Sequence, residues 1–235
     1  MVFETNDYQK MNSMPYVGEQ APHFNANSTQ GNISLDDYKG KWFILFAHPS
    51  DFDPVSTSEF VALQVASSKL RELNVEVVGI SVDNITSHVA WLNSIEETFD
   101  TQIEFPLIAD LNKQISTDYG MLSKESNGSE TSRVIFIIDE DSVVRSVIDY
   151  PATIGRNINE ILRVIKALKT TDKTEHVTPA NWETGDKILA PSPSIIKDAK
   201  NRMENPDYEC KNWYYCEKDS DDHSKNIYNA FLQDK

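Results

Sequence analysis

The sequence predicts an α/β protein with a mixed central sheet flanked by helices and a long C-terminal extension. Three observations carry this prediction. Short apolar runs alternate with segments of helical periodicity up to about residue 119. Two more strand-like runs and one helix follow, as in a sheet covered on both faces. After residue 170 the apolar periodicity fades, so we expect a core over 1–170 and an extension over 171–235.

The first half of the chain alternates strands and helices. A hairpin is expected over 22–35, around the turn-forming Gln30 and Gly31. The run 41–47 is continuously apolar, as expected of a strand buried on both faces, and a proline-bracketed loop leads from it into a helix over 55–73. The other elements expected here are a strand over 75–82, a helix over 86–99, a strand over 105–109 and a helix over 111–119.

The second half closes the sheet and then changes character. Strands over 133–139 and 143–150 are expected to pair around an acidic turn, and a helix is expected over 157–168. Beyond it the segment is interrupted by Pro179, Pro191, Pro193 and Pro206. Such a segment does not predict an independent core, so we expect it to pack on a neighbouring subunit.

Charge and composition exclude several classes of function. The chain has 22 basic and 37 acidic residues and a net charge of −15, which disfavours binding to nucleic acid or to an anionic membrane surface. No apolar run approaches the roughly 18 residues of a membrane span, and residues 1–10 carry no signal-peptide pattern. We therefore expect a cytoplasmic protein without a membrane segment. The histidines at 23, 176 and 223 lack metal-ligand spacing, so neither a metal nor another cofactor is expected.

The loop 48–54 is the expected place for a functional site. Ligands of open α/β sheets bind beyond the carboxyl ends of the strands, and this loop joins a buried strand to the start of a helix. The helix N-terminus offers free backbone N–H groups and the positive end of the helix dipole. Both features stabilise an anion.

Residues 46–60, FAHPSDFDPVSTSEF, resemble the active-site stretch of peroxiredoxins of the AhpC/TSA family, with its pattern Pro-x-x-x-(Thr/Ser)-x-x-Cys. Further similarities are the run 79–83 followed by His88 and Trp91, the strand that opens with Arg133, and the late segment 210–216. The resemblance extends from about residue 15 to 216 and is to the subgroup typified by archaeal thioredoxin peroxidases. It implies a thioredoxin-like fold and a homo-oligomer of dimers that can assemble into rings of ten.

The resemblance also implies a reaction and its residues. In the family a thiolate attacks hydrogen peroxide or an alkyl hydroperoxide, becomes a sulfenic acid, and is returned to the thiol by thioredoxin or a similar reductant. Matched to this chain, Pro49 shields the pocket, Arg133 holds the anionic sulfur and the peroxide, and Glu59 and His48 are supporting groups.

Both cysteines of the chain lie near its C-terminus. Cys210 matches the resolving cysteine of the family and Cys216 the additional cysteine of the subgroup. Without the resemblance they would be read as buried apolar residues, because their spacing is not Cys-x-x-Cys. A disulfide between the two, or with a partner, stays open. The neighbouring Trp213, Tyr214 and Tyr215 are expected to anchor against another subunit rather than to form a recognition surface.

Two departures from the pattern fall at its reactive positions. The attacking position is Ser56, and the Thr/Ser position is Asp53. A hydroxyl is far less acidic than a thiol and has no sulfenic state, so this chain is expected not to turn over peroxide. The non-enzymatic alternative is an oligomeric scaffold or holdase with the peroxiredoxin fold.

Two interpretations of the departures stay open. In one, Asp53 replaces the lost thiolate as the counter-ion of Arg133, so that the two changes form one retuning; in the other, the two substitutions, natural or engineered, are unrelated. A hydrolase triad of Ser56, Asp53 and His48 is disfavoured because no Gly-x-Ser-x-Gly elbow surrounds the serine.

Overall fold

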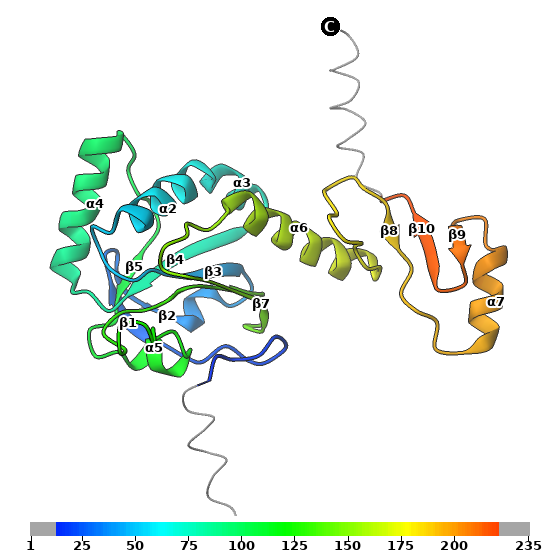
Figure 1. The fold of residues 1–235 in the computed structure, drawn as a ribbon, viewed down its shortest axis with the longest axis horizontal. Helices are drawn as coiled ribbons and strands as arrows, with labels where there is room; N and C mark the ends of the chain where they lie inside the picture. Colours follow the sequence, from blue (N-terminus) through cyan, green and yellow to red (C-terminus); the bar gives the residue numbers. More distant parts are fainter. Residues whose placement is uncertain (1–12, 221–235) are drawn as a thin grey trace, which may run out of the picture. The chain divides into compact units, whose positions relative to one another are not determined.

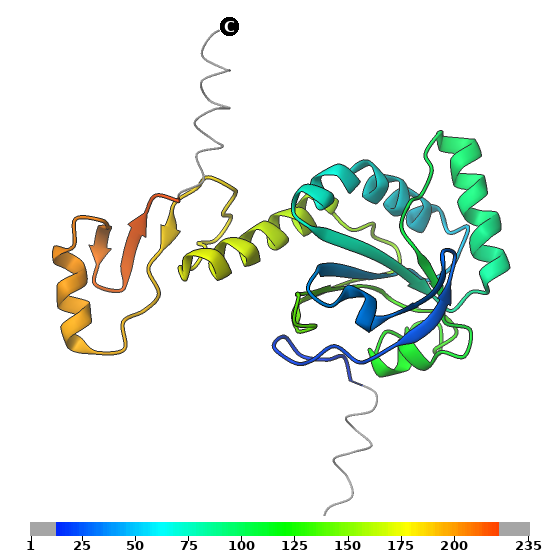
Figure 2. The ribbon, with the colours of Figure 1, turned by 180° about the vertical axis from the view of Figure 1, so that it is seen from behind.

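A computed structural model describes residues 13–220 of the chain, which divides into two compact units, Met1–Ile158 and Asn159–Lys235. The first twelve residues and His223 lie outside the described part. Figure 1 and, from behind, Figure 2 show the two units. No helix within residues 13–220 is long and apolar enough to cross a membrane.

The first unit is built on one mixed sheet of seven strands in the order β2-β1-β5-β4-β3-β6-β7. Its centre is parallel, since β3 pairs with β4 and β4 with β5, whereas β6 runs antiparallel to β3 and β7 antiparallel to β6. The strands are β1 (Asn25–Ser28), β2 (Gly31–Ser34), β3 (Trp42–Ala47), β4 (Val75–Ser81), β5 (Leu107–Ala109), β6 (Arg133–Ile138) and β7 (Val144–Tyr150). The predicted strands and both hairpins are confirmed.

The helices of this unit follow the predicted order with two differences, the unpredicted 3-10 helix η1 and a break in the helix expected over 55–73. They are η1 (Leu35–Tyr38), α2 (Pro54–Val65), α3 (Ser67–Glu72), α4 (Ile85–Phe99) and α5 (Gln114–Asp118). The single helix expected over 55–73 is two helices that meet at Ala66. The prediction missed this break because the apolar positions keep a helical spacing across it.

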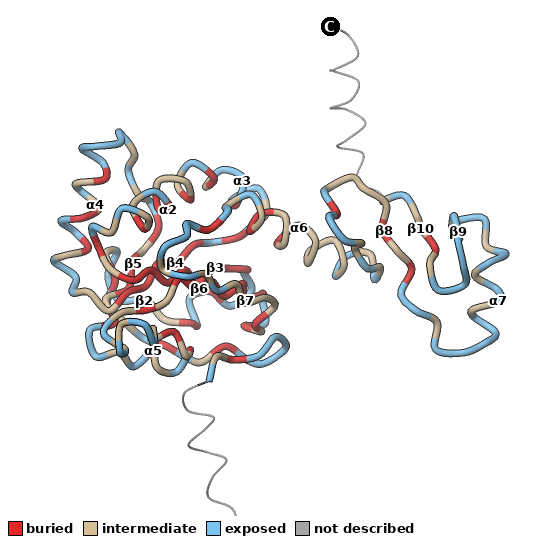
Figure 3. Tube along the Cα trace, viewed as in Figure 1, coloured by how far each residue is buried: buried red, intermediate tan, exposed pale blue. Residues whose placement is uncertain are grey.

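Both faces of the sheet are covered, as the continuous apolar runs predicted. On one face, alternate residues of β3 and β6 pack in a cluster with residues of η1 and α5. On the other face, Phe60 of α2 contacts Phe46 of β3 edge to face and lies against Trp91 of α4. Burial is concentrated in β3, β4 and β6 (Figure 3). Trp42, Trp91 and Phe136 are buried.

The second unit contains more regular structure than the sequence indicates. It comprises the helices α6 (Ile158–Thr174) and α7 (Ile196–Glu204) and the strands β8 (Ile188–Leu189), β9 (Glu209–Asn212) and β10 (Tyr215–Lys218), which form a sheet in the order β8-β10-β9. Trp182, Ile188, Ala190 and Cys216 are its buried residues beyond α6. The expected division into a core over 1–170 and an extension that packs on a neighbouring subunit stays a prediction.

Candidate functional site

The site lies where β3 ends and α2 begins. Strand β3 is buried along its whole length, and the chain turns after it through a loop in which Phe52 adopts a left-handed conformation, with φ 59°. Proline then occupies the first turn of α2, where its missing N–H is tolerated, and Asp53 is the N-cap residue. This local sequence starts the helix at Pro54 and directs its first turn into the protein.

Ser56 is fully buried in that first turn and bonded on two sides. Its backbone N–H and its hydroxyl both donate to Oδ2 of Asp53, at 2.6 and 2.7 Å. Its Oγ accepts a hydrogen bond of 2.9 Å from Nη1 of Arg133, which stands at the start of β6. The structure thus brings together the three sequence-predicted residues Ser56, Asp53 and Arg133.

Arg133 binds two carboxylates at once. Its Nη2 lies 2.5 Å from Oδ2 of Asp53, its Nη1 lies 3.1 Å from Oε2 of Glu59, and its Nε donates to the carbonyl oxygen of Ala152 at 2.7 Å. Only 1% of the Arg133 side chain is exposed. Each nitrogen of the guanidinium therefore already has an acceptor.

Glu59 joins Arg133 to a second buried arginine, Arg156. The Arg156 guanidinium donates to both carboxylate oxygens of Glu59, at 2.6 and 2.8 Å, and to the carbonyl oxygen of Ala47 at 2.7 Å. Its plane lies over the Phe46 ring, 3.5 Å from the centroid. Burial lowers the pKa of Arg156, and Glu59 opposes that shift. Sequence reasoning missed this residue because its carboxylate partner is 97 positions away and no local motif marks it.

The site is electrically balanced by its own side chains. Two guanidiniums, of Arg133 and Arg156, face two carboxylates, of Asp53 and Glu59. Partial burial raises the pKa of Asp53, but hydrogen bonds from Arg133 and Ser56 outweigh that effect and hold the pKa below its ordinary value. Asp53 is therefore ionised near neutral pH and supplies the negative charge beside Arg133.

His48 belongs to a separate buried cluster. Its Nε2 lies 3.2 Å from Oδ1 of Asp51, and the same carboxylate lies 2.9 Å from Nδ1 of His88. The second nitrogen of His88 lies 3.1 Å from the carbonyl oxygen of Ile108. Burial lowers the pKa of His48, and Asp51 opposes the shift; hydrogen bonds from the two histidines overcome burial and lower the pKa of Asp51.

This arrangement leaves no hydrolase triad at Ser56. Nε2 of His48 is directed to Asp51, and its Nδ1 has no hydrogen-bond partner among the described residues. The nucleophile of a triad must be bonded to its base, and Ser56 is bonded to Asp53 and Arg133 instead. Groups of His48, Asp51 and Asp83 lie close enough to ligate a metal ion, but hydrogen bonds within the cluster already account for their grouping. Pro49 is buried in the loop, and its shielding role stays a prediction.

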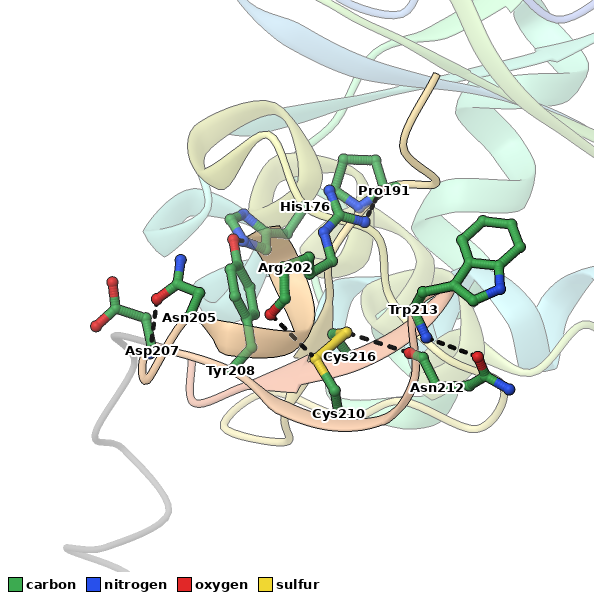
Figure 4. The surroundings of a disulfide bond; sticks show 10 residues. All are labelled: His176, Pro191, Arg202, Asn205, Asp207, Tyr208, Cys210, Asn212, Trp213 and Cys216. Carbon is green, nitrogen blue, oxygen red and sulfur yellow. Dashed lines mark hydrogen bonds between the residues drawn. A yellow bond between two sulfur atoms is a disulfide. The ribbon is translucent and has the colours of Figure 1, made fainter. Parts of the chain in front are cut away.

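The two cysteines lie in the second unit, apart from this network in the chain. Cys210 of β9 and Cys216 of β10 form a disulfide and are register partners in the hairpin (Figure 4). The expectation that left an internal or an external disulfide open is thereby resolved in favour of the internal one. Whether Cys210 acts as a resolving cysteine stays a prediction.

The comparisons with known proteins agree with the geometry. The AhpC/TSA family matches residues 17–147, and the C-terminal domain of 1-Cys peroxiredoxin matches residues 167–205. The chain belongs to the peroxiredoxin family. "Peroxiredoxin 2" of Picrophilus torridus is 47% identical over 199 residues, which cover 85% of this chain and 96% of the relative. The peroxiredoxin of Thermotoga maritima is 41% identical over 210 residues, which cover 87% and 97%.

Solved peroxiredoxin structures confirm the thioredoxin-like fold with a C-terminal extension. The yeast mitochondrial 1-Cys peroxiredoxin has a TM-score of 0.80 at 32% identity, and the match covers 88% of this chain and 100% of the yeast chain. A cysteine-to-serine mutant of the peroxiredoxin 6 of Arenicola marina also has a TM-score of 0.80 at 32% identity, covering 88% and 98%. The family is one of thiol-dependent peroxidases, and the expected antioxidant oxidoreductase class is confirmed at that level.

Proposed function

We propose that this chain is a peroxiredoxin that does not reduce peroxide at position 56. The observation that carries the proposal is the pair of hydrogen bonds from Ser56 to Asp53, at 2.6 and 2.7 Å. A serine oxygen cannot be oxidised to a sulfenic acid, and here the hydroxyl donates a hydrogen bond to a carboxylate that Arg133 also binds. The hydroxyl is thus held as a helix-capping partner instead of an ionised nucleophile.

Asp53 supplies the charge that a thiolate would supply. The family's hydroxyl at this position can donate a hydrogen bond to peroxide, whereas an ionised carboxylate only accepts. An incoming peroxide oxygen would also have to displace Asp53 from the guanidinium of Arg133, at 2.5 Å. The two departures therefore act together. Ser56 removes the nucleophilic thiolate, and the carboxylate of Asp53 supplies the negative charge beside Arg133 instead.

Peroxide consumption tests this proposal directly. The protein is mixed in a stopped-flow instrument with hydrogen peroxide, thioredoxin, thioredoxin reductase and NADPH, and an alkyl hydroperoxide is tested in parallel. We expect no sustained NADPH oxidation above the rate of the reductase system alone. Turnover within tenfold of a working peroxiredoxin would refute the proposal, and a matched Ser56→Ala variant shows whether any residual rate depends on the hydroxyl.

Without turnover, we propose that the chain serves as a homo-oligomeric scaffold or holdase. Large apolar side chains on the second unit support this role, because Ile196, Met203 and Trp213 are 78%, 50% and 48% exposed. Light scattering should give a dimer or a larger ring, and the protein should suppress aggregation of a heat-denatured client. A monomer with no effect on the client would exclude it. The cytoplasmic location and the use of thioredoxin as a partner stay predictions.

A further inference from the structure

The buried cluster of His48, Asp51 and His88 consists of titratable groups that the network around Ser56 does not use. The two histidine side chains have no exposed surface, and the Asp51 side chain is 2% exposed. His48 and Asp51 lie in the loop 48–54, whereas His88 belongs to α4, 37 positions after Asp51. The cluster therefore joins the loop that leads into Ser56 to a helix from a later part of the chain.

The hydrogen bonds of the cluster fix the number of protons that it holds. Nε2 of His88 lies 3.1 Å from the carbonyl oxygen of Ile108, and a carbonyl only accepts, so this nitrogen must donate. Nδ1 of His88 lies 2.9 Å from Oδ2 of Asp51. Nε2 of His48 lies 3.2 Å from Oδ1 of the same carboxylate. Each of these contacts needs a proton between its two atoms, so the three hydrogen bonds hold three protons in all.

A third proton makes the cluster electrically neutral. Two neutral imidazoles beside an ionised carboxylate hold two protons and carry one uncompensated negative charge. Burying such a charge is costly, and one further proton cancels it. The carboxylate of Asp83 lies close by, because its Oδ2 accepts from the backbone N–H of Asp51 at 3.0 Å and from the Ser81 hydroxyl at 2.9 Å. This neighbouring carboxylate also favours a cation in the cluster.

The third proton fits His88 better than the other two groups. Burial raises the pKa of Asp51, but hydrogen bonds from His48 and His88 outweigh that effect and lower it, so the carboxyl is ionised. Burial lowers the pKa of His48, and a second proton on His48 would stand on Nδ1, which has no hydrogen-bond partner among the described residues. His88 has an acceptor at both ring nitrogens.

We propose that His88 is a positioning residue that acts as a buried imidazolium: it carries a proton on each ring nitrogen and, through Asp51, ties the loop 48–54 to α4 and β5. The loop ends at Asp53 and leads into Ser56, so His88 fixes both without touching either. The stabilisation is present while the Nδ1 proton is bound. It is lost when this proton dissociates to solvent as the pH rises, because Asp51 then faces a lone pair and the cluster becomes negative.

Nuclear magnetic resonance of ¹⁵N-labelled histidine tests the protonation directly. At pH 7.5, where a solvent-exposed histidine is mostly neutral, we expect a proton on both nitrogens of His88. The internal comparison is His176, whose Nδ1 lies 2.6 Å from the carbonyl oxygen of Thr174 and whose Nε2 lies 3.1 Å from the hydroxyl of Tyr208, which can donate. One proton is enough there. The spectrum of His88→Gln identifies the His88 signals, and a single proton on His88 in the unsubstituted protein would overturn the proposal.

Asp51→Asn is the variant that separates charge from shape. A carboxamide can donate from its NH₂ to Nδ1 of His88 and accept from Nε2 of His48, so all three hydrogen bonds form with only two ring protons. We expect His88 in this variant to keep the Nε2 proton alone at pH 7.5. The matched control is Asp139→Asn, which changes a buried carboxylate (7% exposed) in the turn between β6 and β7 and should leave both protons on His88. Loss of the Nδ1 proton in both variants would overturn the assigned ion pair.

Hydrogen exchange tests whether the proton holds the loop. The backbone N–H at position 51 donates to Asp83 and reports on the loop directly. Its exchange, corrected for the intrinsic effect of pH, should accelerate by about tenfold across the pH range in which His88 loses its Nδ1 proton, since a hydrogen bond to a charged group is lost there. The same range should change exchange less than twofold in Asp51→Asn. Unchanged exchange in the unsubstituted protein would overturn the positioning role. None of these measurements involves peroxide, so this proposal and the proposed function fail separately.

Discussion

The two units differ in the reactive groups that they carry: the first has the buried arginines, and the second has the cysteines. The first unit keeps the electrostatic frame of the site, with Arg133 and Arg156 buried against carboxylates, but it has an oxygen at position 56. The second unit has the only cysteine pair, Cys210–Cys216, which joins two strands of a small sheet. Neither unit has both an activated thiol and a cationic pocket.

This contrast shows that the ionic network at Ser56 does not need sulfur. In the first unit, the buried arginines require negative partners whether or not a thiolate is present, because an unpaired buried charge is costly. Asp53 meets that requirement for Arg133. In the second unit, the cysteines are held by backbone pairing between β9 and β10 and need no charged partner.

The largest effect is expected from restoring a thiol to the first unit. Ser56→Cys alone should stay nearly inactive, because a carboxylate about 4 Å from a thiolate costs about 4 kcal/mol at an effective dielectric near 20, or about three units of thiol pKa. Asp53→Thr with Ser56→Cys removes that repulsion and should consume peroxide at least 100-fold faster. Stopped-flow peroxide decay at pH 7 measures both. Equal rates for the two variants would show that the substitutions are unrelated.

Removing the central carboxylate should give the largest loss of stability. Glu59→Gln leaves Arg156, whose side chain has no exposed surface, without its charged partner, and breaking such a buried pair costs about 3 kcal/mol or more. The urea midpoint of the first unit, followed by tryptophan fluorescence, measures the change. The matched control is Glu104→Gln, since Glu104 is also 3.1 Å from an arginine, Arg71, but both side chains are more than half exposed. Equal shifts for the two variants would contradict the argument.

The two units also differ in how well their secondary structure could be predicted from the sequence. The sheet of the first unit could be predicted because β3, β4 and β6 carry apolar runs, broken in β4 only by the exposed Glu76, and glycine, proline and acidic turns separate them. The regular elements of the second unit could not, because β8 has two residues and β9 and β10 have four each. Strands this short carry too few alternations to produce a period-two signal, so a turn signal has to mark them. The equally short β1 and β2 were predicted from the turn-forming Gln30 and Gly31 where they join, whereas β9 and β10 are joined through Trp213 and Tyr214, which are not turn-forming residues.

The site was predictable where the family resemblance or the local sequence marks a residue, as for the distant Arg133, and not where only a long-range contact reveals it. Asp53, Ser56 and Glu59 lie within seven residues of sequence, and the capping role of an aspartate before Pro54 follows from helix chemistry. Arg156 and the Asp51 carboxylate are identified only when strands and loops from distant parts of the chain are brought together. A grouping of His48 with Ser56 and Asp53 would therefore give the histidine the wrong neighbours, because the competing acceptor, Asp51, is bound from two sides.

In the second unit, removal of the disulfide should cost an intermediate amount. Cys210→Ser/Cys216→Ser opens a loop of seven residues, for which the chain-entropy model gives about 2 kcal/mol. We expect faster hydrogen exchange in β9 and β10 and no change in the urea midpoint of the first unit. A shift of that midpoint as large as the shift caused by Glu59→Gln would show that the disulfide also stabilises the first unit.

Acidification should affect the first unit through Asp53. Because the pKa of Asp53 is lower in the folded state, the unfolded chain binds more protons in the window between that pKa and the ordinary value of about 4. The stabilisation by ionised Asp53 is therefore complete above about pH 4 and is lost as the pH falls through the folded-state pKa. Asp53→Asn should flatten the loss of stability between pH 5 and pH 3, measured by urea unfolding at each pH. An unchanged slope would contradict the assigned ion pair with Arg133.

The smallest effect is expected at an exposed ion pair next to the disulfide. Nζ of Lys187 lies 2.5 Å from Oε2 of Glu209, and the hydrogen bond to Glu209 raises the pKa of Lys187. A raised lysine pKa gives stabilisation that is complete below its ordinary value near 10.5 and is lost as the pH rises through the folded-state value. Because both groups are exposed to solvent, we expect Glu209→Gln to leave hydrogen exchange in β9 and β10 unchanged within error at pH 7. Exchange accelerated as much as in the double cysteine variant would show that this ion pair stabilises the small sheet as much as the disulfide does.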